Sequence, residues 1–327
     1  MMPRLWPAAA GLAAAALALT ACGAPAAPAA PAARTASART TTHEIHVGPR
    51  TRSYVQISPL RPGAGPVPVI VMLSGIHAPV GTEMARDGLL GLASTGRAEL
   101  IYPVGVNKSW NAIGCCGTAN RKHVDDVGFL RALAPRLDPG RTRPIYLAGY
   151  SNGGRLVYRV LCTDPGLFTG YEVIKAMPEP GCVVSKPVSI LQIDSTDDRG
   201  VPLKPGEHGR ESPPATTEMA RLRRVGQCRA SATSGKGGPV QVTTWTRCRQ
   251  GTRITFAVYQ GGGHSWPTGG GGTTPAATLM SDFAGAAGTG QHSTGQHSTG
   301  QHSTAATAGQ HGGTSAGHQG SGPAASK

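Results

Sequence analysis

One serine stands between two glycines where the sequence changes from an expected strand to an expected helix. The segment "LAGYSNGGRLVYRVL" at 147–161 begins with apolar residues and continues as an amphipathic helix. Gly149, Ser151 and Gly153 match the pattern G-x-S-x-G, in which a tight turn exposes a serine hydroxyl at the end of a strand. The backbone amide of Asn152 comes at the helix start, where it can donate to an oxyanion. The spacing predicts a nucleophilic serine.

A serine hydroxyl is a weak nucleophile, so this interpretation requires a base and a group that orients the base. Candidates follow Ser151 in the order acid and then histidine, which is the order expected for this type of turn. The segment "DSTDDRGVP" offers Asp194, Asp197 and Asp198 directly after the apolar run "VSILQI". His264 lies in the glycine-rich segment "GGGHSWP", just beyond the run "RITFAVYQ". We predict that His264 is the base and that one of these carboxylates orients it.

The elements that must position these residues alternate between short β-rich runs and amphipathic segments. An opening hairpin is expected at 43–60, further strands at 67–75, 98–105, 143–151, 188–196 and 253–261, and helices at 82–96, 124–137, 152–163 and 215–226. This alternation predicts an α/β fold with a mostly parallel central sheet flanked by helices. Ligands of such sheets bind at the carboxyl ends of the strands, which is where Ser151 is expected.

Several segments together resemble one known family. They are "WNAIGCCG" at 110–117, "VDDVGFLRAL" at 124–133, "GYSNGGRLVYRVLC" at 149–162, "LQIDSTDDRGVP" at 191–202 and "GGGHSWP" at 261–267. The chain resembles, over residues 67–283, the secreted polyhydroxybutyrate depolymerases and feruloyl esterases of the carbohydrate esterase 1-like α/β-hydrolases, a group with mycobacterial-type lipoprotein members. The resemblance implies an α/β-hydrolase fold and a serine esterase that forms an acyl-enzyme and needs no cofactor.

The resemblance also suggests the catalytic acid. The family usually has an H-G-T-x-D-x-x-V-P arrangement, whose aspartate corresponds to Asp198 in this chain, with Asp197 as the alternative. Here Ser195 stands where the family prefers glycine. By the same matching, Ser151 is the nucleophile and His264 the base.

The expected oxyanion hole and substrate cleft depend on further residues. The family usually has histidine and glycine after the third strand, whereas this chain has Ser74 before the glycine. The backbone amide of Ile76 would supply the second oxyanion donor beside Asn152, and an amide does not depend on the Ser74 side chain. Trp110, Asn111 and Trp266 are candidates for lining the substrate cleft, with structural packing as the alternative for both tryptophans.

The amino-terminal residues indicate export. Residues 1–21 combine Arg4 with an uncharged apolar run, as signal peptides do, and end before Cys22 as "LTAC", which resembles a bacterial lipobox. Lipidated Cys22 and an Ala/Pro-rich linker would occupy 22–42. Two or more acyl chains hold a protein on a membrane, so we expect a protein anchored to the outer face of the cell membrane; an ordinary secreted protein is the alternative.

The carboxyl-terminal segment 287–327 consists largely of GQHST repeats and related units without aromatic residues. Such a segment cannot bury enough apolar surface to fold alone. A solvated tail is therefore expected, with loose binding of a transition metal by its histidines as the alternative. The hydrolase domain would occupy 43–286.

With Cys22 set aside, six cysteines remain, and an even number in an exported chain indicates disulfides. We expect Cys228 and Cys248 to close a local loop. Adjacent Cys115 and Cys116 are expected to find two distant partners, because a bond between neighbours requires strained geometry. Cys162 and Cys182 complete the set. The spacing contains no paired C-x-x-C motif, so no zinc site is predicted.

The formal net charge of +14 comes from basic residues scattered along the chain. Scattered charge does not form a nucleic-acid surface, so we predict an ester as the substrate and no nucleic-acid partner. Two other functions stay open. A serine peptidase would use the same three residues, and an anchored binding protein could keep the hydrolase shell without the chemistry.

Overall fold

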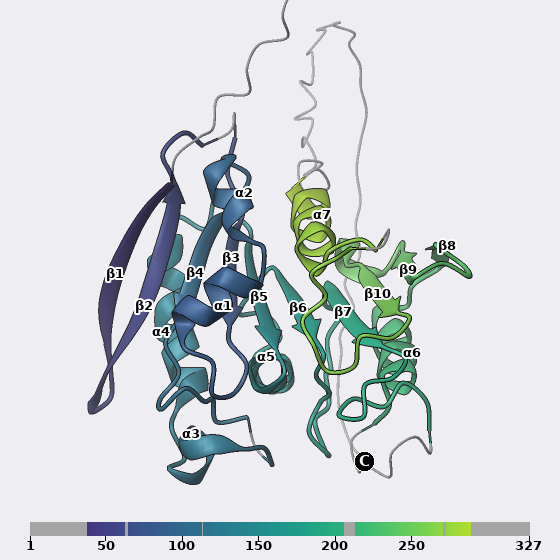
Figure 1. Cartoon of the computed structure of the whole chain (residues 1–327), viewed down its shortest axis with the longest axis horizontal. Coiled ribbons are helices and arrows are strands. Elements are labelled where there is room, and N and C mark those ends of the chain that lie inside the picture. The colour runs from purple at the N-terminus through teal and green to yellow at the C-terminus, as the bar shows by residue number, and fades with distance from the viewer. Residues whose placement is uncertain (1–37, 63–64, 113, 206–212, 271–272, 289–327) are drawn as a thin grey trace, which may run out of the picture.

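The described part of the chain is built around one sheet of ten strands (Figure 1). The computed structural model describes residues 38–62, 65–112, 114–205, 213–270 and 273–288. Its strands are β1 (Ala38–Val47), β2 (Arg50–Pro59), β3 (Val69–Leu73), β4 (Glu99–Pro103), β5 (Ile145–Tyr150), β6 (Gly170–Ile174), β7 (Ile190–Ser195), β8 (Ala230–Ser234), β9 (Val240–Thr246) and β10 (Ile254–Tyr259). In space they follow the order β1-β2-β4-β3-β5-β6-β7-β10-β9-β8.

The six central strands, from β4 to β10, are parallel, and both edges of the sheet are antiparallel. Apolar runs such as "VIVML" in β3 are buried on both faces, as parallel strands covered by helices require. The predicted mostly parallel sheet and α/β-hydrolase fold are confirmed.

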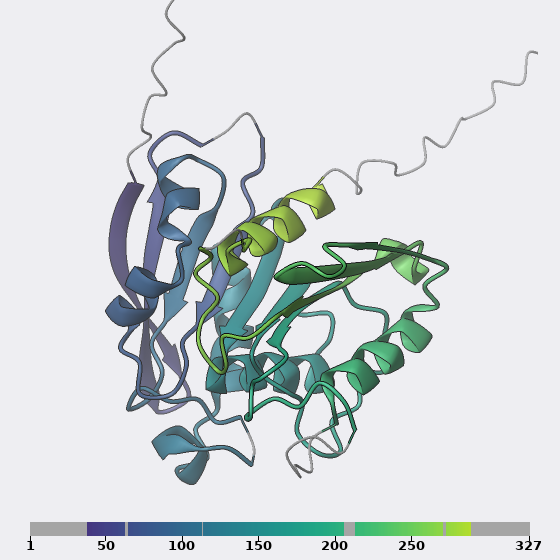
Figure 2. The ribbon, with the colours of Figure 1, turned by 45° about the vertical axis from the view of Figure 1, so that its right-hand side comes forward.

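Helices cover both faces of the sheet (Figure 2). They are α1 (Val80–Arg86), α2 (Leu90–Ser94), α3 (Gly117–Arg121), α4 (Asp126–Leu137), α5 (Asn152–Thr163), α6 (Ala215–Gly226) and α7 (Ala276–Gly288), with a short 3-10 turn at Arg249–Gly251. Alternate residues of β3 point into two separate apolar clusters. One cluster contains residues of α4, α5 and α6, and the other contains residues of α1, α2 and α7.

Some elements differ from the sequence-based expectation. The expected helix at 82–96 is divided into α1 and α2, because Gly88 between them has a positive φ of 72°. Strands β6, β8 and β9 are not predicted from the sequence: β6 contains the buried charged residue Glu172, and the mostly exposed sequence "ASATS" of β8 has no apolar alternation. Strand β1 begins at Ala38, within the range expected to be linker.

The six cysteines of the domain form three disulfides. Cys228 is bonded to Cys248, as predicted, and Cys162 is bonded to Cys182. The expectation that Cys115 and Cys116 have distant partners is wrong, because these neighbours are bonded to each other. The backbone turns sharply there: Cys116 has a φ of 93°, and the flanking Gly114 and Gly117 also have positive φ.

The expected signal peptide, the lipidated Cys22 and the histidine-rich repeats lie outside the described residues. Among the residues that the structure describes, no helix is both long and apolar enough to cross a membrane.

Candidate active site

Ser151 occupies a strained turn between β5 and α5. Its φ of 52° is uncommon for a residue with a side chain. The glycines around it are required by close backbone contacts: a Cβ on Gly153 would lie 2.4 Å from the carbonyl oxygen of Leu73, and one on Gly149 would lie 2.5 Å from the carbonyl carbon of Gly153. The turn is thus pressed against the end of β3, with the hydroxyl at the carboxyl edge of the sheet.

Ser151, His264 and Asp198 form a continuous chain of hydrogen bonds. The Nε2 atom of His264 lies 2.8 Å from the Oγ atom of Ser151, and the Nδ1 atom of His264 lies 2.8 Å from the Oδ2 atom of Asp198. Asp198 follows β7 and His264 follows β10, and these strands are parallel neighbours. Their loops therefore meet at one edge of the sheet. Such a chain can pass the serine proton to the imidazole while the carboxylate orients the ring.

The three candidate carboxylates have different surroundings. Asp198 is the one with an oxygen within hydrogen-bond distance of His264. Asp197 instead accepts a hydrogen bond of 2.8 Å from the Gly263 amide. Asp194 is buried within β7 and accepts a bond from the side-chain amide of Gln192. The geometry therefore favours Asp198 over Asp197 as the orienting group.

The environment of Asp198 keeps its carboxyl group ionised. Burial acts to raise its pKa, but the hydrogen bond and charge of His264, the amide of Gly200 and the charge of Lys175 outweigh burial. The pKa of Asp198 is therefore below its ordinary value. The Asp198 side chain is fully buried, whereas 42% of the His264 side chain is exposed. The acid is shielded from water while the base can reach an incoming molecule.

The expected oxyanion donors lie on two segments beside the serine. The Asn152 amide is in the first turn of α5, where amides have no intrahelical partner. The chain leaving β3 passes close by: a Cβ on Gly75 would be 3.7 Å from the Cβ atom of Ser151. Ile76 follows directly. The side chain of Asn152 faces another way and exchanges two hydrogen bonds with the backbone of Trp110.

Trp110 is a structural residue of the site. It is fully buried, and its indole N–H donates to the Ser74 carbonyl at 2.9 Å. These contacts favour structural packing, the alternative given for Trp110, over a place in the substrate cleft. The sequence gives no sign of this burial because a tryptophan can serve either purpose.

The other two cleft candidates are also largely buried. Trp266 packs edge-on against Tyr150 with ring centroids 5.7 Å apart, and the Tyr150 hydroxyl donates to the His264 carbonyl. These contacts hold the histidine loop. Asn111 donates from its side chain to the Val124 carbonyl and borders a cavity of about 470 Å³.

Comparison with known proteins agrees with this geometry. No family model matches the chain. The chain is 29% identical over 277 residues to "Putative esterase NocK" of Nocardia uniformis subsp. tsuyamanensis, a match that covers 73% of this chain and 77% of that protein. The chain has an α/β-hydrolase fold and is similar in sequence to this putative esterase.

Solved structures similar to this chain share little sequence with it. An acetyl xylan esterase from Aspergillus awamori is 10% identical with a TM-score of 0.48, covering 75% of this chain and 99% of that one. A feruloyl esterase module from Clostridium thermocellum is 10% identical with a TM-score of 0.46, covering 70% and 83%. An IroE-like serine hydrolase from Shewanella oneidensis is 15% identical with a TM-score of 0.45, covering 70% and 75%.

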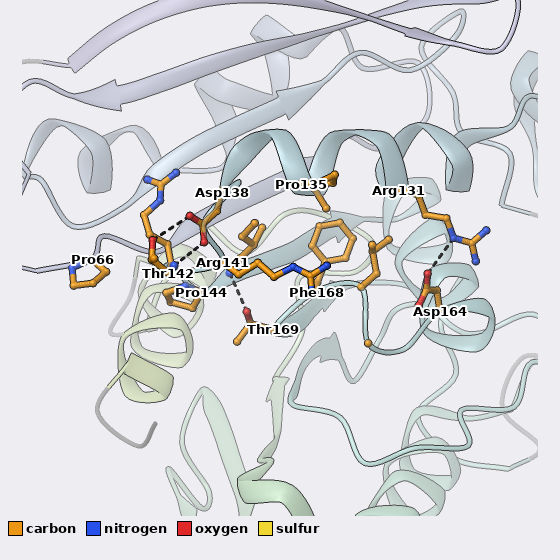
Figure 3. Close-up of a pocket in the computed structure, with 15 residues that line it drawn as sticks. Pro66, Arg131, Pro135, Asp138, Arg141, Thr142, Pro144, Asp164, Phe168 and Thr169 are labelled. Carbon is orange, nitrogen blue, oxygen red and sulfur yellow. Dashed lines mark hydrogen bonds and ion pairs between the residues drawn. The ribbon is translucent and has the colours of Figure 1, made fainter. Parts of the chain in front are cut away.

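A groove of about 660 Å³ lies away from the serine of the hydrolase (Figure 3). Arg131, Asp138 and Phe168 are among its lining residues, together with Ile145 at the start of β5. Ser151 follows the other end of the same strand, roughly 16 Å or more away at the usual rise per residue. The groove is therefore separate from the reacting groups.

Sequence reasoning misses one charged residue of the site, Lys175. It follows β6 directly, and its side chain lies beneath the loops that carry Asp198 and His264. The signal in the sequence is weak, because the strand "GYEVI" before Lys175 contains a charged residue and is itself not predicted.

Asp194 gives a pH-dependent prediction. Burial outweighs its hydrogen bond with Gln192 and the attraction of Lys175, and it raises the pKa of Asp194 to about 8. The folded chain therefore holds this proton more tightly than the unfolded chain does, where an aspartate titrates near about 3.9. The contribution of protonated Asp194 to the free energy of unfolding is complete below about pH 4. It is lost as the pH rises towards 8, by about 1.4 kcal/mol per pH unit.

We expect Asp194→Asn to remove this loss, because an amide has no proton to release. The free energy of unfolding of the variant, minus that of the wild type, should rise between pH 5 and pH 8 in urea denaturation experiments. Asp164→Asn, at a partly exposed ion pair, is the control and should give a much flatter difference. A constant difference for Asp194→Asn would contradict the assignment.

Proposed function

We propose that the chain is a serine esterase that hydrolyses carboxylic esters through an acyl-enzyme on Ser151. The observation that carries the proposal is the chain of two 2.8 Å hydrogen bonds joining Ser151, His264 and Asp198. The similarity to a protein described as an esterase supports the choice of an ester bond.

The first half of the reaction forms the acyl-enzyme. Nε2 of His264 takes the proton of Ser151 as Oγ bonds to the ester carbonyl carbon, and the carbonyl oxygen becomes an oxyanion. The amides of Asn152 and Ile76 stabilise this oxyanion, and Asp198 stabilises the imidazolium. When the carbonyl re-forms, the bond to the alcohol oxygen breaks and His264 donates its proton to that oxygen. The alcohol leaves, and the acyl group stays on Ser151.

The second half releases the acid by the same route. Water replaces the alcohol, His264 takes a proton from the water, and the resulting oxygen attacks the acyl carbon. The bond to Ser151 then breaks as His264 returns the proton to Oγ. Because each half requires a neutral imidazole at its start, activity should fall at acidic pH.

We propose only the chemical class of the ester substrate. Hydroxyalkanoate, feruloyl, acetyl and short acyl esters are the candidates that the family resemblance suggests. The same three residues can also cleave peptide bonds, so peptide substrates belong in the same screen.

The serine assignment is tested with a fluorophosphonate probe, which bonds to activated serines. We expect the full chain to gain one adduct, located on Ser151 by mass spectrometry, and Ser151→Ala to gain none. Ser231→Ala, which removes an exposed hydroxyl on β8 and keeps Ser151, is the matched control and should still be labelled. A folded wild-type chain that takes up no probe would instead support a binding protein with a hydrolase shell.

We also propose that the hydrolase is anchored to the outer face of the cell membrane through lipidated Cys22. The support is the sequence "LTAC" after an export-type apolar run. In fractionated bacterial cells, the wild-type chain should sediment with membranes, and Cys22→Ser should lose most of this association. Equal distribution of both chains would refute the anchor.

A further inference from the structure

A buried lysine lies at the end of β6, beneath the active site. Only 1% of the Lys175 surface is exposed. Its φ of 53° is uncommon for a residue with a side chain, and its backbone amide donates to the Ile193 carbonyl of β7 at 2.8 Å. The backbone thus turns out of the sheet while the side chain remains inside the protein.

The ammonium group of Lys175 joins the two loops that carry the acid and the base. Nζ donates to the hydroxyl of Ser195, the last residue of β7, from which the chain continues to Asp198. Nζ also donates to the Gly263 carbonyl at 2.6 Å, and Gly263 directly precedes His264. One side chain therefore bonds to both segments whose separation decides whether Asp198 reaches His264.

Carboxyl groups surround this lysine. Burial lowers the pKa of Lys175, and Asp198, Asp194 and Asp197 act in the opposite direction. Asp194 lies on β7, the other two carboxylates lie on the loop after it, and His264 lies on the loop after β10. The lysine charge in turn helps to lower the pKa of Asp198.

Stability alone does not account for a lysine in this position. Removing an ammonium group from water costs several kcal/mol, and well-packed apolar residues often replace buried ions at no loss of stability. The bonds of Nζ go to the two catalytic loops and not to Ser151, so the lysine contacts neither the nucleophile nor the reacting atoms. Its contacts fit a role in holding other groups in place.

We propose that Lys175 is a positioning residue, which fixes the His264 loop against the ends of β6 and β7 and so holds the imidazole beside Asp198. This inference rests on the proposed function, since it assigns Lys175 to the serine, histidine and aspartate site. Lys175 positions the acid and the base and does not itself contact the reacting atoms. Its removal should therefore lower kcat more than it changes KM.

The test compares Lys175→Met with Lys175→Arg in the full chain. Methionine keeps much of the volume and removes the charge, whereas arginine keeps the charge. The measurements are kcat and KM for p-nitrophenyl acetate, and the rate of fluorophosphonate labelling, from pH 5 to pH 9. Arg253→Met is the matched control, because Arg253 is a largely buried cation beside the start of β10, at the opposite end of the strand from His264.

We expect Lys175→Met to lower kcat by about tenfold or more with KM changed by less than about twofold, as loss of positioning should. The acid limb of kcat/KM should move to higher pH, because Asp198 is protonated more readily when the charge of Lys175 is removed. Lys175→Arg should keep the acid limb in place and recover part of kcat. Arg253→Met should leave the limb unmoved.

Two results would overturn the inference. One is a folded Lys175→Met chain with the kcat and acid limb of the wild type, and the other is identical behaviour of the methionine and arginine variants. If near-ultraviolet circular dichroism shows that Lys175→Met does not fold, Ser195→Ala decides, since it removes one acceptor and keeps the cation. It should lower kcat severalfold with the acid limb in place, and an unchanged kcat would overturn the inference.

The labelling experiment separates this inference from the proposed function. A wild-type chain that is not labelled at Ser151 would refute the esterase and the role of Lys175 together. If the wild type is labelled at Ser151, and the Lys175 variants have the kcat, acid limb and labelling rate of the wild type, only the role of Lys175 is refuted.

Discussion

The site depends on the turn at Ser151, where the chain must leave β5 and enter α5 within a few residues. That turn presses the first residues of α5 against the carbonyl groups at the end of β3, so the spaces around Gly149 and Gly153 are too small for a Cβ. The same turn gives Ser151 its positive φ and places the first amides of α5 beside the hydroxyl. Strain at one residue is offset by the packing of the fully buried strand β5 before it and the buried face of α5 after it.

The parallel order of the strands supplies the other two groups. Strands β7 and β10 are far apart in sequence but paired in register, with Tyr259 opposite Ser195. The loops that follow them therefore leave the sheet side by side, and Asp198 and His264 need only short loops to meet. Further bonds fix this meeting: Asp197 accepts from the Gly263 amide, and Tyr150 donates to the His264 carbonyl. Backbone contacts thus position the catalytic side chains.

The sequence was sufficient to predict the features that are local or that follow the strand pattern. The G-x-S-x-G turn, the parallel sheet and the loops after β7 and β10 leave clear signals, because glycine spacing and apolar runs report directly on backbone geometry. Choosing between Asp197 and Asp198 required a family resemblance, since neighbouring carboxylates differ only in the direction of their side chains.

Features that depend on tertiary packing gave weak or misleading signals. Trp110 is buried against the carbonyl of Ser74, which no periodicity predicts. The bond between Cys115 and Cys116 depends on the positive φ values around it, which only the folded loop reveals. Lys175 has the sequence of an ordinary strand end, and its burial follows from the loops that close over it.

The central claim is that the hydroxyl of Ser151 and the amides of Asn152 and Ile76 converge on one reacting carbonyl. A crystal structure of the phosphonylated chain tests this directly, because the phosphonyl oxygen occupies the place of the oxyanion. We expect an oxygen within hydrogen-bond distance of both amide nitrogens, with His264 still bonded to Asp198. An oxygen that points into solvent, away from both amides, would contradict it.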